Sequence, residues 1–127
     1  MLKNLPTFSD SRGCLTAINK GFEFAPKRIF YIYNVPKGEK RGAHAHIKSK
    51  QILVCISGSV KVSLNDGKSV QEYILNKNQS LYIDNMIWDE QTYLTGDEIL
   101  LAICSEEHSE DDYIRDYELF LKEKLNG

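Results

Sequence analysis

The segment KGEKRGAHAHIKSKQILVCISGSVKVSLNDG, residues 37–67, places short apolar runs between turn residues. Val, Ile and Leu dominate residues 51–57 and 59–65, a composition that favours pleated, half-buried strands. Gly58 separates these two runs, and the second ends at Asn65, Asp66 and Gly67, residue types that tolerate the positive φ of a tight turn. The segment therefore predicts consecutive antiparallel strands joined by hairpin turns.

Runs of the same kind recur along the chain and change character only near its C-terminal end. Further strands are expected at residues 14–19, 28–35, 43–47, 69–75, 80–84 and 98–104. After Ser109, a candidate N-cap followed by acidic residues, the apolar residues take a helical spacing. We therefore expect one domain over residues 1–127, an all-β jelly-roll barrel or sandwich. Its antiparallel strands would occupy about 12–105 and one C-terminal helix about 110–125.

Composition narrows the class of protein. The chain has 127 residues, of which 42% are hydrophobic and 27% charged, as is ordinary for a soluble globular protein. The net charge is −2 and the lysines and arginines are spread along the chain, which argues against nucleic acid as a partner. No apolar stretch has the length of a signal peptide or a membrane span. Three widely spaced cysteines are expected to be reduced thiols, and cytoplasmic location follows from that expectation.

His44 and His46 are the main candidates for chemistry. Residues i and i+2 of a strand project from the same face, so the two imidazoles would lie side by side. Such a pair could transfer protons or hold a metal, and it could also be a hydrogen-bonded pair without a chemical role.

The spacing around this pair resembles the first motif of the cupin superfamily. Gly38, His44, His46 and Gly58 fall at its positions, but Gln51 stands where the motif has a glutamate. The second cupin motif supplies a further histidine, and DNMIWD (residues 84–89) places Asp89 in that position. A neutral amide is a poor ligand for first-row divalent metals. We therefore expect a cupin barrel with no metal and no cofactor, in which the histidine pair transfers protons.

A closer resemblance is to the TDP-4-keto-6-deoxyglucose 3,4-ketoisomerases, the WxcM-like cupins of glycan biosynthesis. It is carried by residues 28–67, by LYIDNMIWDE (81–90) and by DDYIRDYELFL (111–121). The resemblance implies metal-free conversion of a TDP-linked 4-keto-6-deoxy sugar to its 3-keto isomer through an enediol-like intermediate. It also implies acid–base roles for His44 and His46, and a place before 3-amino-3,6-dideoxyhexose formation. The family is typically homodimeric, with exchanged N-terminal strands.

Further residues are candidates for this site. Tyr31 and Tyr33 share a strand face and could donate to the enediolate, although aromatic packing is an equal reading. Arg41 and Arg12 have guanidinium groups suited to a pyrophosphate. Trp88 could stack on thymine or the sugar, or close one end of the barrel. Gln51 and Asp89, which depart from the cupin pattern, are also expected to contact the substrate.

Three other functions remain as alternatives. A TDP-sugar 3,5-epimerase would need its histidine base, an aspartate and a tyrosine arranged differently. A non-catalytic sugar-binding cupin would be compatible with Asp89 in the place of a histidine. A metal-dependent dioxygenase is disfavoured by Gln51 and by the lack of a third histidine in the motifs.

Overall fold

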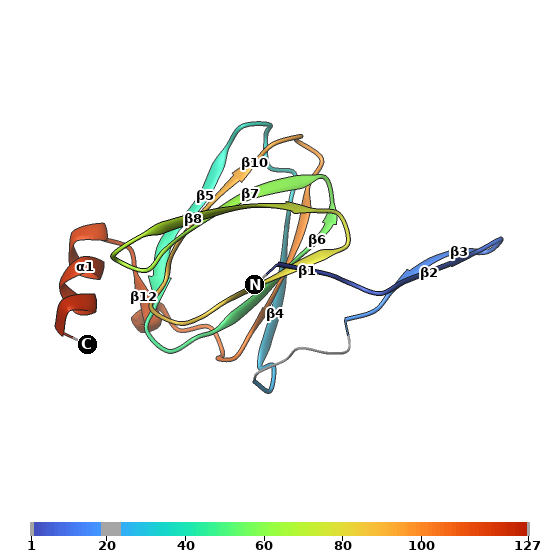
Figure 1. Ribbon diagram of the computed structural model, residues 1–127. Coiled ribbons are helices and arrows are strands. Elements are labelled where there is room, and N and C mark those ends of the chain that lie inside the picture. The colour runs from blue at the N-terminus through green and yellow to red at the C-terminus, as the bar shows by residue number, and fades with distance from the viewer. Residues whose placement is uncertain (1, 19–23, 127) are drawn as a thin grey trace.

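The computed structural model describes residues 2–18 and 24–126, in which two large antiparallel sheets pack face to face and a two-stranded hairpin forms a third, separate sheet (Figure 1). Within the described residues each of the two large sheets has five strands. The first sheet has the order β1 (Leu2–Asn4), β9 (Gln79–Ile83), β6 (Gln51–Ser57), β11 (Ile99–Cys104), β4 (Arg28–Tyr33). The second has the order β12 (Tyr113–Ile114), β5 (Lys40–His46), β10 (Trp88–Tyr93), β7 (Ser59–Asn65), β8 (Val70–Asn76). The all-β jelly-roll prediction is confirmed.

The two predicted hairpin turns are formed as their sequences indicate. Gly58 joins β6 to β7 with φ +76, and a Cβ there would lie only 2.7 Å from the Thr95 hydroxyl. Between β7 and β8, the side chain of Asn65 accepts a hydrogen bond from the Gly67 N–H. The side chain of Asp66 accepts from the N–H groups of residues 68 and 69. These local bonds satisfy backbone donors that the ladder leaves unpaired.

The hydrophobic core fills the space between the sheets. Alternate residues of β6, β7 and β11 point inward, and among them Leu53, Val60, Val62 and Leu100 are almost fully buried. Burial of each such side chain contributes roughly 1.5–3 kcal/mol. Two of the three cysteines, at positions 55 and 104, belong to this core, and all three are free thiols.

Strand β10 was not expected, because its sequence WDEQTY lacks an apolar alternation. Its inward residues are nonetheless buried, and they form a polar row through the barrel. The Tyr93 hydroxyl donates to Gln91 Oε1 at 2.8 Å, and Gln91 Nε2 donates to Asp89 Oδ2 at 3.2 Å. Hydrogen bonding within the row offsets the cost of burying these groups. Strands β1 and β2 (Thr7–Asp10) were not expected either, because the predicted strands begin at about residue 12. Asn19, the last residue of the predicted strand 14–19, lies outside the described residues.

The C-terminal helix is present, but its expected start is wrong. Residues 110–112 form a short 3₁₀ turn, Tyr113–Ile114 form β12, and helix α1 covers only Tyr117–Asn126. The apolar residues at 113 and 114 fit a helical spacing, yet β12 pairs with the end of β5 and buries Ile114 there. Asp116, rather than Ser109, caps the helix by accepting from the Glu118 N–H at 2.9 Å.

One hairpin stands away from the barrel. Strand β2 pairs with β3 (Gly13–Thr16), and Figure 1 shows this pair projecting from the sheets. Phe8 and Leu15 on it are more than half exposed. In the part of the chain that the structure describes, every helix is too short or too polar to cross a membrane.

Candidate active site

A bulge in β5 determines which side chains face the barrel interior. Asp89 pairs with His44, and the next residue of β10, Glu90, pairs with Gly42, so Ala43 is the extra residue. Gly42 and Ala43 both have positive φ, +86 and +59. A Cβ on Gly42 would lie 2.9 Å from the Asp89 carbonyl oxygen, so only glycine fits.

This bulge changes the face on which Arg41 lies. Simple alternation along a strand would place residues 41 and 44 on opposite faces. With the extra residue between them, both Arg41 and His44 border one cavity of about 330 Å³. The prediction that Arg41 lies near the histidine pair is therefore supported by geometry that the sequence alone does not predict.

The two histidines lie together at this end of the barrel, as their spacing predicts. Their ring centroids are 5.1 Å apart and their planes are nearly perpendicular. His44 borders the cavity, while His46 is only 8% exposed and lies behind it. The pair is thus unequal: one imidazole faces the open space and the other is enclosed by protein.

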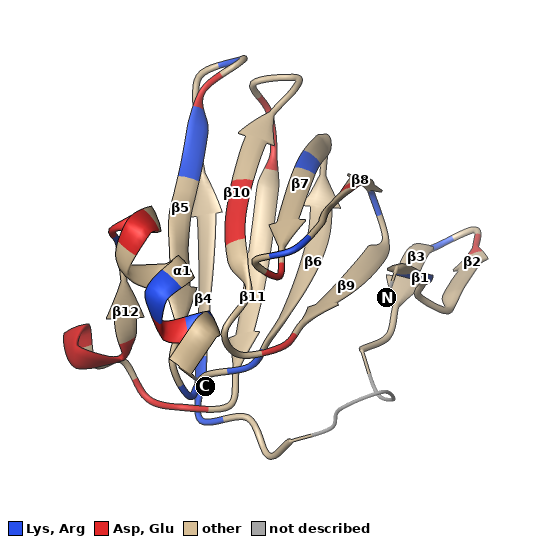
Figure 2. Cartoon of the chain, turned by 60° about the vertical axis from the view of Figure 1, so that its left-hand side comes forward, with Lys and Arg blue, Asp and Glu red and all other residues tan. Residues whose placement is uncertain are grey.

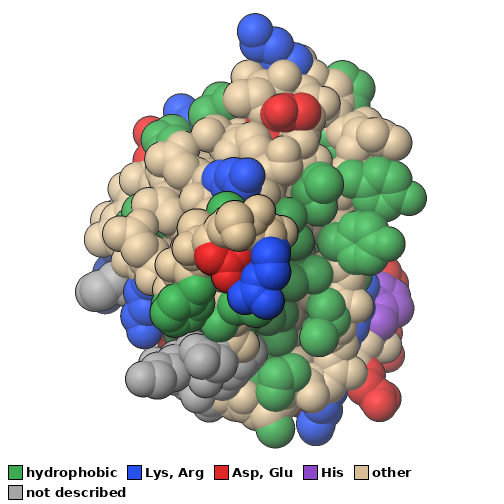
Figure 3. All heavy atoms as spheres, turned by 90° about the vertical axis from the view of Figure 1, so that its right-hand side faces the viewer, with side chains coloured by type: hydrophobic (Ala, Val, Ile, Leu, Met, Phe, Trp, Pro, Cys, Tyr) green, Lys and Arg blue, Asp and Glu red, His purple; other side chains and the backbone are tan. Residues whose placement is uncertain are grey.

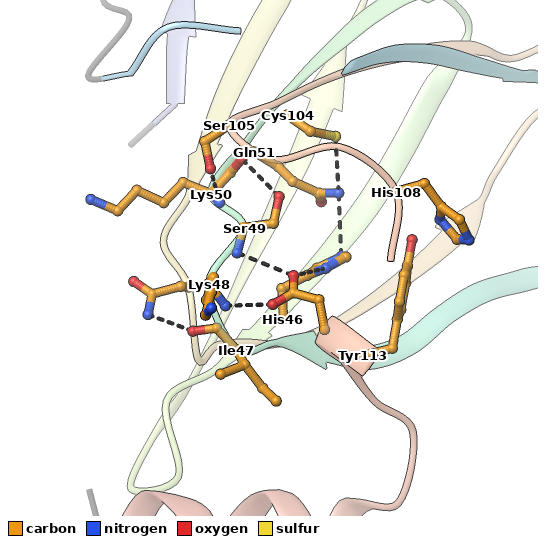
Figure 4. Close-up of polar contacts among 12 residues, drawn as sticks. His46, Ile47, Lys48, Ser49, Lys50, Gln51, Cys104, Ser105, His108 and Tyr113 are labelled. Carbon is orange, nitrogen blue, oxygen red and sulfur yellow. Dashed lines mark hydrogen bonds and ion pairs between the residues drawn. The ribbon is translucent and has the colours of Figure 1, made fainter. Parts of the chain in front are cut away.

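His46 has hydrogen-bond partners at both ring nitrogens (Figure 4). Its Nδ1 lies 3.2 Å from Asp112 Oδ2, and its Nε2 lies 3.4 Å from Gln51 Nε2. The Gln51 amide also contacts Cys104 Sγ at 3.5 Å. Gln51 therefore lies in the site, as expected, but in this structure its contacts are with His46 and Cys104.

Burial lowers the pKa of both imidazoles. The pKa of His44 falls to about 4, first because of burial and then because of the positive charges of His46 and Arg115. The pKa of His46 is also lowered by burial, against which the hydrogen bond and charge of Asp112 act to raise it. Near neutral pH both rings are therefore uncharged, and each has one nitrogen with a free electron pair.

Three arginines give the cavity a positive character that the overall charge of −2 conceals. Arg28 from β4, Arg41 from β5 and Arg115 after β12 all border it. Figure 2 shows the basic residues at the start of β5 and the acidic turn beside β12. A phosphate-bearing ligand or a developing oxyanion would be stabilised here.

Tyr113 and Arg115 are site residues that sequence reasoning missed. The Tyr113 ring lies 5.2 Å from His44 and 4.4 Å from His46, and its hydroxyl accepts from Arg28 at 3.3 Å. The Arg115 guanidinium lies 4.4 Å over the Tyr113 ring and bonds to Glu110. Both lie within residues 110–125, where the sequence predicts a helix, and the structure places them before α1 instead. The quoted DDYIRDYELFL block was the available signal for them.

Tyr31 and Tyr33, which were expected to donate to the intermediate, point away from the barrel interior in this chain. On β4, Phe30 and Ile32 point into the barrel, so the tyrosines alternate with them and point outward. Tyr31 borders the cavity, but the residue is 62% exposed and its ring stacks on that of Tyr33, with the centroids 5.6 Å apart. Among the described residues, Tyr113 is the tyrosine whose ring packs against both imidazoles.

The expectation that Trp88 stacks on thymine or the sugar does not match its position in the structure. It precedes Asp89 on β10 and therefore points to the outer face, where it is 6% exposed. Its ring lies 5.7 Å from Phe120 and 5.2 Å from Tyr117, both in α1. Trp88 fastens the helix to the sheet and does not border the cavity.

Arg12 and Asp89 also differ from expectation. Arg12 lies at the tip of the projecting hairpin, where its side chain is 88% exposed and pairs with Asp10 at 2.7 Å. It does not border the cavity of its own chain. Asp89 points into the barrel on the face of His44 and is 3% exposed, but it lies beneath the cavity instead of lining it.

The Asp89 carboxyl group is poorly solvated. Its Oδ1 has no hydrogen-bond partner among the described residues, and burial raises its pKa to about 7. In the described ranges, no three His, Cys, Asp or Glu side chains are grouped so that they could hold a metal ion.

Comparison with known proteins places this geometry in a family. The family model described as FdtA, WxcM-like, C-terminal matches residues 1–125. The chain is 40% identical over 122 residues to the TDP-4-oxo-6-deoxy-alpha-D-glucose-3,4-oxoisomerase of Aneurinibacillus thermoaerophilus, which covers 94% of this chain and 88% of that protein.

Solved structures of 3,4-ketoisomerases are also similar to this chain. A 3,4-ketoisomerase from Helicobacter canadensis has a TM-score of 0.92 and 37% identity, over 98% of this chain and 96% of that one. QdtA, a sugar 3,4-ketoisomerase from Thermoanaerobacterium thermosaccharolyticum solved with TDP, has a TM-score of 0.91 and 35% identity, over 99% and 94%. A histidine-to-asparagine mutant of QdtA was solved with TDP-4-keto-6-deoxyglucose, and its TM-score to this chain is also 0.91, with 34% identity over 99% and 94%.

Proposed function

The chain belongs to the FdtA, WxcM-like family, and we propose that it is a 3,4-ketoisomerase that converts TDP-4-keto-6-deoxyglucose into a TDP-3-keto-6-deoxyhexose. The single observation that carries the mechanism is that His44, an uncharged imidazole, borders the same cavity as Arg28, Arg41 and Arg115. A base beside several fixed positive charges suits a reaction that passes through an anion.

The reaction consists of proton transfers only. The base removes the proton from C3, and the electron pair of that bond forms a C3–C4 double bond while the C4 carbonyl becomes an enediolate oxygen. A proton is then delivered to C4, and the proton of the C3 hydroxyl is transferred to the C4 oxygen as the new carbonyl forms at C3. No electrons leave the substrate, and the proton count is unchanged, so acid–base groups alone are sufficient.

We assign the proton transfers at carbon to His44, because it is the imidazole that borders the cavity. Its lowered pKa keeps it in the basic form near neutral pH. His46 is the second acid–base group, with its ring 5.1 Å from that of His44. Gln51 donates to the His46 Nε2, so this contact must be given up before that nitrogen can take a proton from the substrate.

The arginines and Tyr113 are assigned to the anionic parts of the substrate. Arg41, on the bulged strand, is suited to the pyrophosphate, since its guanidinium can form paired bonds to phosphate oxygens. The Tyr113 ring packs against both imidazoles and Arg115 lies over that ring, so the phenol hydroxyl and the guanidinium can donate to the oxygen that gains charge. Tyr113 therefore takes the role first given to Tyr31 and Tyr33.

A homodimer with exchanged N-terminal strands is part of the proposal. The support is an apolar surface around the projecting hairpin (Figure 3), where Phe8, Leu15, Ile29, Tyr31 and Tyr33 are all more than half exposed. Apolar surfaces of this kind are typical of protein contacts. Exchange would also carry Arg12 away from its own barrel and onto that of the partner.

Mixing two inactive variants tests this arrangement. If Arg12 of the partner subunit completes each site, hybrid dimers of Arg12→Ala and His44→Asn contain one site with both native residues, and activity returns on mixing. If Arg12 acts in its own chain, each site lacks one residue and mixing restores nothing.

The 3-keto product has the functional group that an aminotransferase needs, so we place the reaction before the formation of a 3-amino-3,6-dideoxyhexose. We propose a cytoplasmic location, because three free thiols persist in a reducing compartment.

The proposed reaction is tested by incubating the protein with TDP-4-keto-6-deoxyglucose and a chelator in D₂O. Ketoisomerisation gives a 3-keto product with deuterium at C4, and its reverse reaction places deuterium at C3 of the recovered 4-keto substrate, as followed by NMR of the ring protons. Exchange at C3 and C5 would instead indicate an epimerase. No exchange at any carbon would rule out both reactions and leave sugar binding without catalysis.

A further inference from the structure

We propose that Asp112 is a positioning residue for this reaction: it fixes the orientation and tautomer of His46 and holds Tyr113 and Arg115 over the cavity. The inference rests on the proposed function for its kinetic effect, but its structural content can be measured without any substrate.

The Asp112 carboxylate accepts hydrogen bonds from both the histidine and the backbone. Its Oδ2 lies 3.2 Å from His46 Nδ1 and also accepts from the Ser49 N–H at 3.2 Å. Its Oδ1 accepts from the Lys48 N–H at 2.7 Å. The side chains of Asp112 and His46 are only 11% and 9% exposed, so water competes little for these bonds. Charge-assisted bonds of this kind are stronger than neutral ones.

These contacts specify where the proton of His46 resides. A carboxylate that already accepts two N–H groups can only accept from the imidazole, so Nδ1 must donate the third bond. At the other side of the ring, the Gln51 amide donates to Nε2, which must then carry the electron pair. Asp112 and Gln51 therefore select the same Nδ1–H tautomer. The free pair of Nε2 is thereby kept on the side of the ring away from Asp112.

The same residue anchors the segment that follows it. The Asp112 carbonyl accepts from the Ile47 N–H at 2.9 Å, and Tyr113 then pairs with His46 in the β5–β12 ladder. Tyr113 packs against both imidazoles, and Arg115 lies over the Tyr113 ring. Loss of the carboxylate would loosen one imidazole together with the phenol and the guanidinium beside it.

Several charged and titratable groups act on His46, and Asp112 is the one that favours its protonated form. Arg28 of β4 and Arg115 oppose protonation. His44, Tyr113 and Cys104 also lie against the ring or its partner Gln51. Burial lowers the pKa of His46, while Asp112 raises it. Removing the negative charge should therefore lower that pKa further.

The kinetic test compares Asp112→Asn with Asp111→Asn, a neighbouring exposed residue that has no place in the proposed site. Asp112→Asn keeps the shape but removes the charge. We expect kcat to fall by about 10- to 100-fold with little change in KM, as for residues that orient another catalytic group. Asp111→Asn should match the wild type. Equal kcat values for both variants would overturn the proposal.

A spectroscopic test remains decisive even if Asp112→Asn folds poorly. Nitrogen-15 NMR of the wild-type protein, with His46 assigned by its loss in His46→Asn, should show the proton on Nδ1. In a folded Asp112→Asn protein, the pKa of His46 should be lower. An Nε2–H tautomer in the wild type would overturn the proposal, whatever its activity. A substrate that is not turned over, with the Nδ1–H tautomer present, would refute only the proposed function.

Discussion

Arg41 and His44 border the same cavity although they are three residues apart on one strand, because Ala43 is bulged out of the β5–β10 ladder. The bulge depends on Gly42, whose φ is +86 and whose α-carbon faces the Asp89 carbonyl. The bulge therefore allows β5 to present the guanidinium of Arg41 and the imidazole of His44 to the same cavity.

Replacing Gly42 by Ala should therefore damage both stability and activity. The new Cβ would meet the Asp89 oxygen at 2.9 Å in a backbone conformation that alanine disfavours. We expect a loss of about 1–3 kcal/mol in the free energy of unfolding and a lower kcat/KM. Gly67→Ala is the matched control, since Gly67 also has a positive φ but lies beside Lys124, away from the cavity. The explanation fails if Gly42→Ala retains the wild-type kcat/KM.

Activity should persist well below the pH at which a free imidazole becomes protonated. His44 must be uncharged to remove the C3 proton, and its pKa is lowered from 6.5 to about 4. As the pH falls from 7 to 5 the basic form therefore remains dominant, and the rate should decline only as the pH approaches 4. The measurement is kcat/KM against pH. An acid limb centred between pH 6 and 7 would contradict the assignment.

The buried carboxyl of Asp89 should make the folded state less stable as the pH rises. Its pKa is raised from 3.8 to about 7, so between these values the folded state holds a proton that the unfolded state has lost. The stability from this group is full below about pH 4 and is lost as the pH rises through 7. Asp89→Asn should be more stable than the wild type at pH 8 by a few kcal/mol, on the order of 1.4 kcal/mol per pKa unit.

Denaturant unfolding of both proteins at pH 5 and pH 8 measures this difference. A stability gap between Asp89→Asn and the wild type that does not grow with pH would show that the carboxyl is not held neutral by burial.

Trp88→Phe should affect stability and leave substrate binding unchanged. The indole packs against Tyr117 and Phe120 of α1 on the outer face of the sheet. A smaller ring leaves a gap there, which should cost about 1–3 kcal/mol and lower Tm. KM for the TDP-sugar should equal that of the wild type. An increase in KM without a change in Tm would restore the original expectation that Trp88 stacks on the substrate.

A feature of this site could be predicted from the sequence where it depends on neighbouring residues in the chain. The hairpins at Gly58 and at Asn65–Gly67 follow from local backbone preferences, and the shared face of His44 and His46 follows from strand geometry. Strand β10 was not predictable from alternation, because its inward residues are polar and satisfied by one another. Because β10 was not predicted as a strand, the sequence also did not indicate that Trp88 points to the outer face of the sheet.

The remaining errors share a physical cause, which is contact between distant segments. Apolar residues 113 and 114 have the same spacing whether they form the first turn of a helix or a short strand, and only pairing with β5 distinguishes the two. Tyr113 and Arg115 were missed for that reason. The bulge at Ala43 likewise depends on the Asp89 backbone, which is far away in the sequence.

Solvent deuterium exchange by His44→Asn tests the central claim most directly, because proton transfer at carbon is assigned to this residue. His108→Asn serves as the control, since that histidine is exposed. With TDP-4-keto-6-deoxyglucose in D₂O, His108→Asn should place deuterium at C4 of the 3-keto product at the wild-type rate. Folded His44→Asn should be slower by about 10²- to 10⁴-fold. Exchange by His44→Asn at the wild-type rate would contradict the mechanism.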